Sequence, residues 1–220
     1  MKTEEMNGIS NADGAVIVER MIDVIRENKQ YLSDIDGAIG DGDHGVNMNK
    51  GFSMTREALE KDPGDLSHGL TTLARILMMR IGGSMGPLYG RIFKTMGKTF
   101  DGKERIDGNL METALGEVRT GISALTPAKV GDKTLVDALF PAIEAYQLVH
   151  REGGSFTEAL EAMKSAANEG RDGTREMVAR LGRSSRLGER SRGVIDAGAA
   201  SCALLLGVMA DAIIELLDRK

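Results

Sequence analysis

The sequence predicts an all-α protein, a single domain over residues 1–220 built as a barrel or bundle of about eight antiparallel helices. Three observations support this fold class. Apolar residues recur at helical spacings along most of the chain, whereas no sustained alternation of β-branched and polar residues indicates a strand. No Pro- or Ser-rich linker divides the chain. No internal repeat is apparent either.

The first half of the chain is expected to form four helices. The first has an apolar face that runs from Val16 to Leu32, and Ser10 or Asn11 is its expected N-cap. The other three are expected at residues 47–61, 65–81 and 88–100. Pro-Gly and Gly-Gly breaks separate them, because these residues end helices.

Four further helices are expected in the second half, at residues 109–125, 133–150, 155–181 and 199–218, the third of which continues or kinks through its glycines. Asp132 is the expected N-cap of the second of these helices. Ser155 and Glu158 have the spacing of a capping box for the third. Cys202 and the methionines at helical spacing are expected to be buried core residues.

Composition excludes several classes of protein. The formal charge of −5 argues against general nucleic-acid binding, which needs a basic surface. A single cysteine excludes an internal disulfide and fits a reducing cytosol. We expect no signal peptide, and the longest apolar run, residues 197–210, is expected to be too short to span a bilayer. The protein is therefore expected to be cytoplasmic, with no nucleic-acid or membrane partner.

An acidic, glycine-rich stretch at residues 36–47 is the strongest sign of chemistry. Asp36, Asp41 and Asp43 offer hard oxygen ligands, which suit Mg²⁺ or Ca²⁺. An EF-hand is excluded, because the positions for its turn glycine and its glutamate hold other residues. A solvated turn, or Asp43 acting as a helix N-cap, remains an alternative. Mg²⁺ takes few carboxylates together with phosphate oxygens, so this stretch favours a phosphorylated ligand.

Four polar, glycine-bearing loops alternate with the predicted helices, at residues 36–47, 82–87, 126–135 and 182–198. Alternate connections of an up-and-down bundle lie at one end, so we expect these loops to form the active end. The Gly-Gly-Ser of the second loop opens a helix whose free N–H groups suit phosphate, although tight helix packing explains it equally well. The fourth loop carries four arginines, of which one is expected to counter phosphate charge and the others to be solvated.

Four motifs in this order make the chain recognisable over nearly its whole length. They are Ile39-Gly-Asp-Gly-Asp-His-Gly-Val-Asn-Met-Asn49, Gly82-Gly-Ser-Met-Gly-Pro-Leu-Tyr-Gly90, Gly131-Asp-Lys-Thr134, and Gly182-Arg-Ser-Ser-Arg-Leu-Gly-Glu-Arg-Ser191 followed by Asp196-Ala-Gly198. With them the chain resembles the nucleotide-binding L subunit of dihydroxyacetone kinase, which is also the C-terminal domain of single-chain dihydroxyacetone kinases.

The resemblance implies a fold, cofactors and site residues. The fold is a barrel of eight antiparallel helices with ADP or ATP bound at one end through two Mg²⁺ ions. The implied metal ligands are Asp36, Asp41 and Asp43. The implied nucleotide-binding residues are His44, Gly45, Val46, Asn47, Ser84, Met85, Thr126, Leu135, Arg183, Asp196, Ala197 and Gly198, with Arg183 also in a catalytic role. Met85 stands where many relatives have Ser, which puts a phosphate or ribose hydrogen bond in doubt. Ala197 stands where Pro is common, which affects loop stiffness.

The implied activity is phosphoryl transfer to dihydroxyacetone or a related ketose that a separate K-type subunit holds through a histidine. The phosphate source is either ATP or a phosphohistidine carrier, an M-type subunit that rephosphorylates bound ADP. The sequence does not decide between these sources, nor between triose and tetrose acceptors, and it leaves a homodimer open. One alternative is a non-catalytic, nucleotide-sensing module that binds a transcriptional regulator, but the three aspartates and Arg183 favour catalysis. The nucleotide domain of a fatty-acid kinase fits less well.

Overall fold

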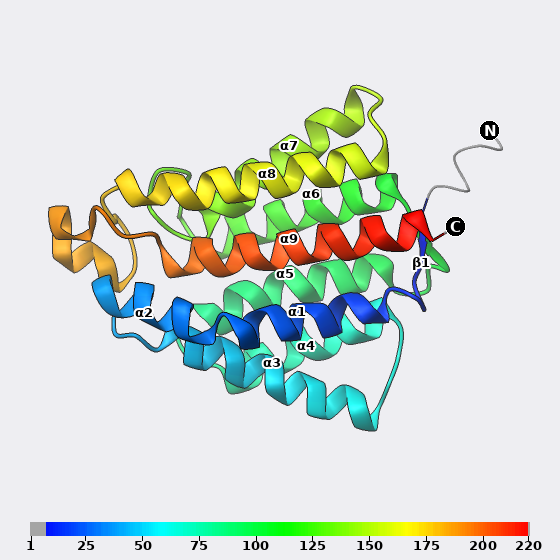
Figure 1. Ribbon diagram of the computed structural model, residues 1–220, viewed down its shortest axis with the longest axis horizontal. Helices are drawn as coiled ribbons and strands as arrows, with labels where there is room; N and C mark the ends of the chain where they lie inside the picture. The colour runs from blue at the N-terminus through cyan, green and yellow to red at the C-terminus, as the bar shows by residue number, and fades with distance from the viewer. Residues whose placement is uncertain (1–7, 220) are drawn as a thin grey trace.

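The computed structural model describes residues 8–219 and has the all-α architecture that the sequence predicts (Figure 1). Residues 1–7, where the absence of a signal peptide was expected, lie outside the described part. The helices are α1 Ala15–Glu27, α2 Lys29–Ile39, α3 His44–Lys61, α4 Leu66–Arg80, α5 Met85–Phe100, α6 Gly108–Leu125, α7 Val136–Arg151, α8 Phe156–Gly173 and α9 Ala197–Asp218, with short 3₁₀ helices η1 Thr174–Glu176 and η2 Arg183–Ser191. Strands β1 Ile9–Ser10 and β2 Arg105–Ile106 form one short antiparallel pair.

The long helices form a closed ring. Around it, each helix packs against the next in the order α1, α3, α4, α5, α6, α7, α8, α9, and α9 packs back against α1. Helix α2 follows α1 after a break at Asn28, so the single helix expected up to Leu32 is two helices. The Asn28 side chain donates to Val24 O at 2.8 Å in the last turn of α1. The apolar pattern continues across this break, and for that reason periodicity did not reveal it.

The barrel encloses one large apolar core, and its largest buried side chains include Tyr146, Phe52, Phe93 and Phe100. Cys202 is buried in it, as expected. Helix α9 is 22 residues long, so the expectation that this apolar segment is too short to span a bilayer is wrong by length and composition. In this fold α9 is packed against α1, α7 and α8 with most of its length buried, which is the arrangement of a core helix.

The helix expected from residue 65 does begin there, and one of the predicted caps is present. The Asp65 side chain accepts from His68 N at 2.9 Å at the start of α4. Ser155 and Glu158 form the expected capping box of α8. Helix α8 includes Gly170 but ends at Gly173, so the expectation that it extends to residue 181 is wrong. Gly170 lies against α7, where a Cβ would stand 2.1 Å from Asp137 O.

Two predicted caps are wrong. Asn11 does not cap α1, since its side chain donates instead to the carbonyls of Phe100 and Lys103 beside the β1–β2 pair. Asp132 does not cap α7, since its carboxylate accepts from Lys129 N within the preceding loop. In both cases the side chain stabilises a loop or turn next to the helix. Sequence spacing does not distinguish these two roles, because the same residue types serve both.

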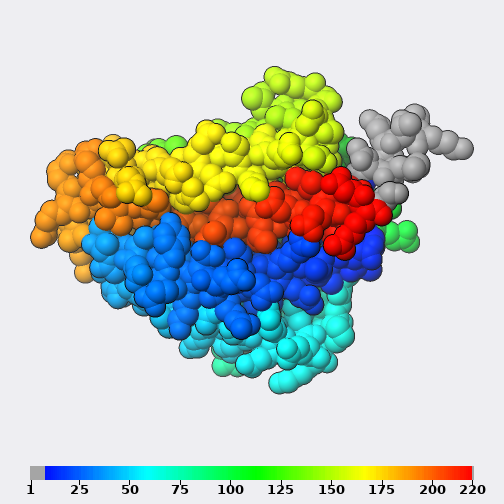
Figure 2. All heavy atoms as spheres, in the orientation of Figure 1, coloured from blue at the N-terminus to red at the C-terminus, as the bar shows by residue number. Residues whose placement is uncertain are grey.

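The four polar loops do meet at one end of the barrel, as the alternation of helices predicted. In Figure 1 this is the end at which α2 and the segment that precedes α9 lie, and β1 and the C-terminal end of α9 lie at the other. Figure 2 shows the segment before α9, in orange, as the tip of the molecule beside the blue α2, and η2 packs against α2.

Candidate active site

A cavity of about 560 Å³ opens at this end of the barrel, and all four polar loops contribute to its wall. It brings together most of the site residues that the sequence predicted. These are Asp36, Asp41, Asp43, His44, Asn47, Ser84, Met85, Thr126, Leu135, Arg183, Asp196, Ala197 and Gly198. The predicted clustering is therefore present, whereas the role of each residue stays a prediction.

The three aspartates lie together although they come from different elements. Their nearest carboxylate oxygens are all within 4.8 Å of one another. Asp36 lies in the last turns of α2, Asp41 in the turn that follows, and Asp43 at the N-cap position of α3. Asp43 makes no side-chain cap bond, so the N-cap alternative for it is wrong. Its carboxylate lines the cavity instead.

Two glycines allow this turn to fold back on α2. Gly42 has a φ of +75°, a left-handed conformation that glycine adopts without steric cost. At Gly40 a Cβ would stand 2.6 Å from Asp36 Oδ1, so only glycine leaves room for that carboxylate. Asp36 Oδ2 in turn accepts from His44 N at 3.2 Å. Gly40 and the backbone N–H of His44 therefore fix the position of the Asp36 carboxylate in the cluster.

The cluster fits a divalent cation of the Mg²⁺ type. All three side chains offer carboxylate oxygens, which are the ligands that Mg²⁺ and Ca²⁺ prefer, and the cluster has no thiol or imidazole ligand. Like charges at this separation repel one another, and a cation is the simplest compensation. Asp36, Asp41 and Asp43 are thus the residues that would hold a metal ion.

A buried chain of hydrogen bonds lies beside the cluster. His44 Nε2 is 2.8 Å from Ser201 Oγ, and Tyr89 Oη is 2.6 Å from the same oxygen. Tyr89 also donates to Gly198 O at 3.1 Å. Burial lowers the pKa of His44 to about 4, although the nearby Asp36 carboxylate opposes this shift. The imidazole is therefore neutral at physiological pH.

Tyr89 and Ser201 were not predicted as site residues. Burial holds the pKa of the Tyr89 hydroxyl well above its usual value, so it stays protonated and acts as a hydrogen-bond donor. It belongs to the Gly82–Gly90 motif, in which the sequence indicated only the Gly-Gly-Ser turn as a candidate phosphate site. Ser201 follows Asp196 on α9, and its position inside the barrel is apparent only from the fold.

Arg183 reaches the acidic cluster from the opposite side of the cavity. It opens η2, and its guanidinium forms an ion pair with the carboxylate of Asp41. Its side chain is 60 % exposed, so it is anchored by this contact and not by burial. Of the arginines in the loop, Arg183 is the one that lines the cavity, as the sequence predicted.

The N-terminus of α9 forms another wall. Asp196 caps this helix by accepting from Ala199 N at 2.8 Å, and burial raises the pKa of its carboxyl group to about 7. Ala197 is the first residue of α9, a position that proline also tolerates, so the departure from Asp-Pro-Gly leaves the cap intact. Met85, at the start of α5, is half-buried against the core and lines the cavity.

Gly45 and Val46 are the predicted site residues that do not line the cavity. Gly45 is buried where α3 crosses α2, and a Cβ there would stand 2.0 Å from Lys29 O. Val46 is 49 % exposed on the outer face of α3. The structure therefore gives Gly45 a packing role and leaves Val46 on the surface.

The 126–135 loop is shaped by two residues that sequence reasoning did not single out. Asp137 is buried, and its carboxylate accepts from Gly131 N at 2.6 Å and from Thr134 N at 2.7 Å. Lys133 is 1 % exposed and has a φ of +60°. Its ammonium points away from solvent into the segment before α9. Their partners are mainly backbone groups, which have no sequence signature.

Comparison with known proteins agrees with this geometry. The DAK2 domain matches residues 38–211. The ADP-binding subunit DhaL of PEP-dependent dihydroxyacetone kinase 1 from Listeria innocua is 39 % identical over 186 residues, which cover 84 % of this chain and 88 % of that protein. This chain belongs to the family of dihydroxyacetone kinase L subunits. The Escherichia coli subunit of the same kind is 34 % identical over 192 residues, 86 % of this chain and 90 % of that protein.

A solved structure has the same fold as this member of the family. It is the dihydroxyacetone kinase of C. freundii in complex with AMP-PNP and Mg²⁺, with a TM-score of 0.65 and 22 % identity over 96 % of this chain and 36 % of that one. The whole fold, and not only the acidic motif, is therefore shared with a kinase that is about three times longer.

Proposed function

We propose that this chain is the nucleotide-binding subunit of a dihydroxyacetone or related ketose kinase, and that it donates the terminal phosphate to a ketose held on a K-type subunit. One observation carries the proposal most directly. A single cavity contains three clustered carboxylates, the N-termini of α5 and α9, and an arginine that faces the carboxylates. Phosphoryl transfer needs this set of groups, because its catalysis consists of positioning and charge neutralisation.

Asp36, Asp41 and Asp43 hold Mg²⁺ in this proposal, with two ions as the resemblance implies. Bound Mg²⁺ would supply positive charge that neutralises the phosphates of the nucleotide. Three carboxylates cannot fill two octahedral shells, so nucleotide phosphates and water complete them. Metal and nucleotide are therefore expected to bind together.

The nucleotide lies across the N-termini of α5 and α9 in this proposal. Ser84 and Met85 line the cavity at the start of α5, where the free backbone N–H groups of a helix N-terminus suit phosphate oxygens. His44, neutral because it is buried, stays in its hydrogen bond with Ser201 and adds no charge to the phosphate site. Arg183 would stabilise charge on the group being transferred.

The ketose is held by a partner in this proposal, because the resemblance implies that a histidine of a separate K-type subunit holds it. A K-type subunit is the proposed acceptor-binding partner, and an M-type phosphohistidine carrier is the partner in systems that keep ADP bound. A cytoplasmic location is proposed with them. A nucleotide-sensing module would need the phosphate pocket but not an arginine aimed at it, so the Arg183–Asp41 contact favours catalysis.

The test measures phosphoryl transfer to a ketose with each of the two phosphate sources, ATP and the phosphohistidine carrier. In the first, the chain is loaded with γ-³²P-ATP and Mg²⁺, mixed with a K-type subunit that holds dihydroxyacetone, and labelled dihydroxyacetone phosphate is counted. In the second, the ADP-loaded chain and a phosphorylated carrier protein replace the ATP-loaded chain in the same mixture with the K-type subunit and dihydroxyacetone. Product in either experiment supports the function and identifies the donor. No product in both, with Mg-ADP binding intact, would favour the sensing module.

A further inference from the structure

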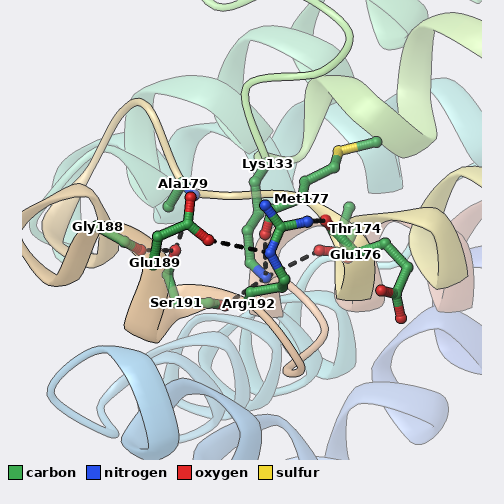
Figure 3. A network of polar contacts seen from close by, with 9 residues as sticks. All are labelled: Lys133, Thr174, Glu176, Met177, Ala179, Gly188, Glu189, Ser191 and Arg192. Carbon is green, nitrogen blue, oxygen red and sulfur yellow. Dashed lines mark hydrogen bonds and ion pairs between the residues drawn. The ribbon is translucent and has the colours of Figure 1, made fainter.

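Lys133 is a buried cation whose partners are all backbone carbonyls (Figure 3). Its side chain reaches from the 126–135 loop into the segment before α9, and the residue is 1 % exposed. The Nζ donates to Thr174 O at 2.8 Å, Met177 O at 3.2 Å, Ser191 O at 2.7 Å and Val194 O at 2.6 Å. Four carbonyl oxygens around one positive charge form the kind of cage that holds a monovalent cation.

These four carbonyls lie at the two ends of one loop. Thr174 and Met177 precede residues 178–190, and Ser191 and Val194 follow them. We call residues 178–190 the arginine loop, because Arg183 lies within it. The ammonium of Lys133 therefore closes the base of the arginine loop and joins both of its ends to the 126–135 loop of the barrel. A side chain far away in sequence thus sets where the loop starts and ends.

The other contacts at this base are uncharged or lie on the surface. Gly193 N donates to Arg175 O at 2.8 Å, and Ala179 N donates to Ser191 Oγ at 2.9 Å. Arg192, which is half-exposed, donates to Glu176 O. Without the ammonium, the four carbonyl oxygens would lose the charged donor that they share. Lys133 is therefore the central interaction of the base.

This arrangement is costly, so it calls for a reason. A buried ammonium loses its hydration, and within residues 8–219 none of the ion pairs involves Lys133. Its φ of +60° is uncommon for a residue other than glycine. Burial lowers the pKa of Lys133, and the nearby Asp196 carboxyl opposes that shift. Strain of this kind persists where the surrounding structure requires it, often at functional sites.

We propose that Lys133 is the positioning residue for Arg183. By closing the base of the arginine loop, its ammonium holds the loop over the cavity so that the guanidinium of Arg183 meets the acidic cluster at Asp41. Lys133 touches neither substrate nor metal in this proposal and acts through Arg183 alone. The role in transfer rests on the proposed function, but the closure of the loop does not.

Hydrogen exchange tests the closure without nucleotide or partner. Lys133→Met keeps the aliphatic stem and removes the charge. We expect amide exchange in residues 178–193 to accelerate at least about tenfold, while exchange in the α4 and α5 core stays unchanged. Lys129→Met is the matched control, because Lys129 is an exposed lysine of the same loop. Exchange in Lys133→Met equal to that in the control would overturn the proposal.

A double-mutant cycle tests the link to Arg183. Lys133→Met is expected to slow single-turnover transfer about a hundredfold, the effect of a displacement of about 1 Å, and to weaken Mg-ADP binding less than about tenfold. If Lys133 acts through Arg183, the double variant Lys133→Met, Arg183→Ala is no slower than Arg183→Ala alone. Effects that multiply would show that Lys133 acts elsewhere, and would overturn the proposal.

Two provisions keep the outcomes distinct. If Lys133→Met does not fold, Lys133→Gln takes its place, since its amide still donates two hydrogen bonds to the same cage without the charge. If the unaltered protein transfers no phosphate at all, the proposed function fails and the exchange experiment alone decides whether Lys133 closes the loop. Faster exchange then supports the closure, and unchanged exchange overturns it.

Discussion

The guanidinium of Arg183 and the carboxylate of Asp41 form an ion pair across the cavity, joining the loop before α9 to the acidic turn after α2. The two residues are far apart in sequence and have different expected roles. Arg183 is expected to counter phosphate charge, and Asp41 is expected to bind a metal ion. A carboxylate oxygen that accepts from Arg183 is less available to a metal ion. We therefore expect Mg-nucleotide to weaken this pair and free Arg183 to face the phosphate.

Arg183→Ala should slow phosphoryl transfer more than it weakens nucleotide binding. Metal ions neutralise much of the ground-state phosphate charge, so an arginine contributes most when charge shifts in the transition state. Arginine fingers contribute on the order of 10³ or more to rate in other phosphoryl-transfer enzymes. Single-turnover transfer and calorimetric Mg-ADP affinity are measured side by side. An equal loss in both, with rescue by Arg183→Lys, would make Arg183 a binding residue only.

Asp41→Asn and Asp43→Asn should each abolish the dependence of ADP binding on Mg²⁺. The amide keeps the size of the side chain but removes a charge from the metal cluster. Calorimetric titration of ADP with Mg²⁺ and with EDTA measures the difference. Asp62→Asn, a change at an exposed aspartate at the far end of α3, is the control and should bind as the unaltered chain does. If the unaltered chain bound ADP equally well with Mg²⁺ and with EDTA, that result would contradict the metal site.

Gly45→Ala should destabilise the fold even without nucleotide. Its new Cβ would stand 2.0 Å from Lys29 O and 2.6 Å from Ser33 Oγ, so α3 must move away from α2 and the acidic turn with it. We expect a loss of about 2 kcal/mol or more in the free energy of unfolding, measured with urea, because overpacking typically costs 1–3 kcal/mol. Val46→Ala is the exposed neighbour for comparison and should change it by less than about 0.5 kcal/mol.

The folded protein should lose stability in acid through His44. Its folded-state pKa of about 4 lies below the unfolded value of 6.5, so the unfolded chain binds a proton first as the pH falls. Stability from this group is complete above pH 6.5 and is lost as the pH falls toward 4, about 2 kcal/mol of it by pH 5. Asp196, whose pKa burial raises to about 7, shifts stability in the opposite direction over the same range. The loss is therefore measured as the difference between the unaltered chain and His44→Gln in urea unfolding in EDTA at pH 7 and pH 5. His44→Gln, which cannot be protonated, should lose correspondingly less.

Most of the fold was predictable because its signals are local. Amphipathic spacing placed the helices, and Asp65 and the Ser155–Glu158 pair marked two helix starts correctly. The clustering of the four loops followed from alternation alone, since successive long helices must reverse direction. The break at Asn28 was missed because the apolar face continues on both sides of it.

The parts of the site that consist of charged side chains were predictable from the sequence. The parts that depend on backbone groups were not. The aspartates and Arg183 have sequence signatures, and the cavity gathers them. Lys133 belongs to the Gly131–Thr134 motif, but the motif does not show its role, because its partners are carbonyls 41–61 residues away that any residue type supplies. Gly45 was assigned to the nucleotide site from its motif, and that role stays a prediction. The structure shows in addition that the absence of its side chain allows the close contact of α3 with α2.

The two ends of the described chain lie at the β1–β2 end of the barrel, remote from the cavity (Figure 1). Attachment at either end, to a sensor chip, a fluorescent protein or a second enzyme, therefore leaves the mouth of the cavity facing outward. Molecules tethered through residue 219 would all present the same face to a partner in solution. The barrel is thus suited to surface-based binding measurements and to engineered fusions without redesign of its site.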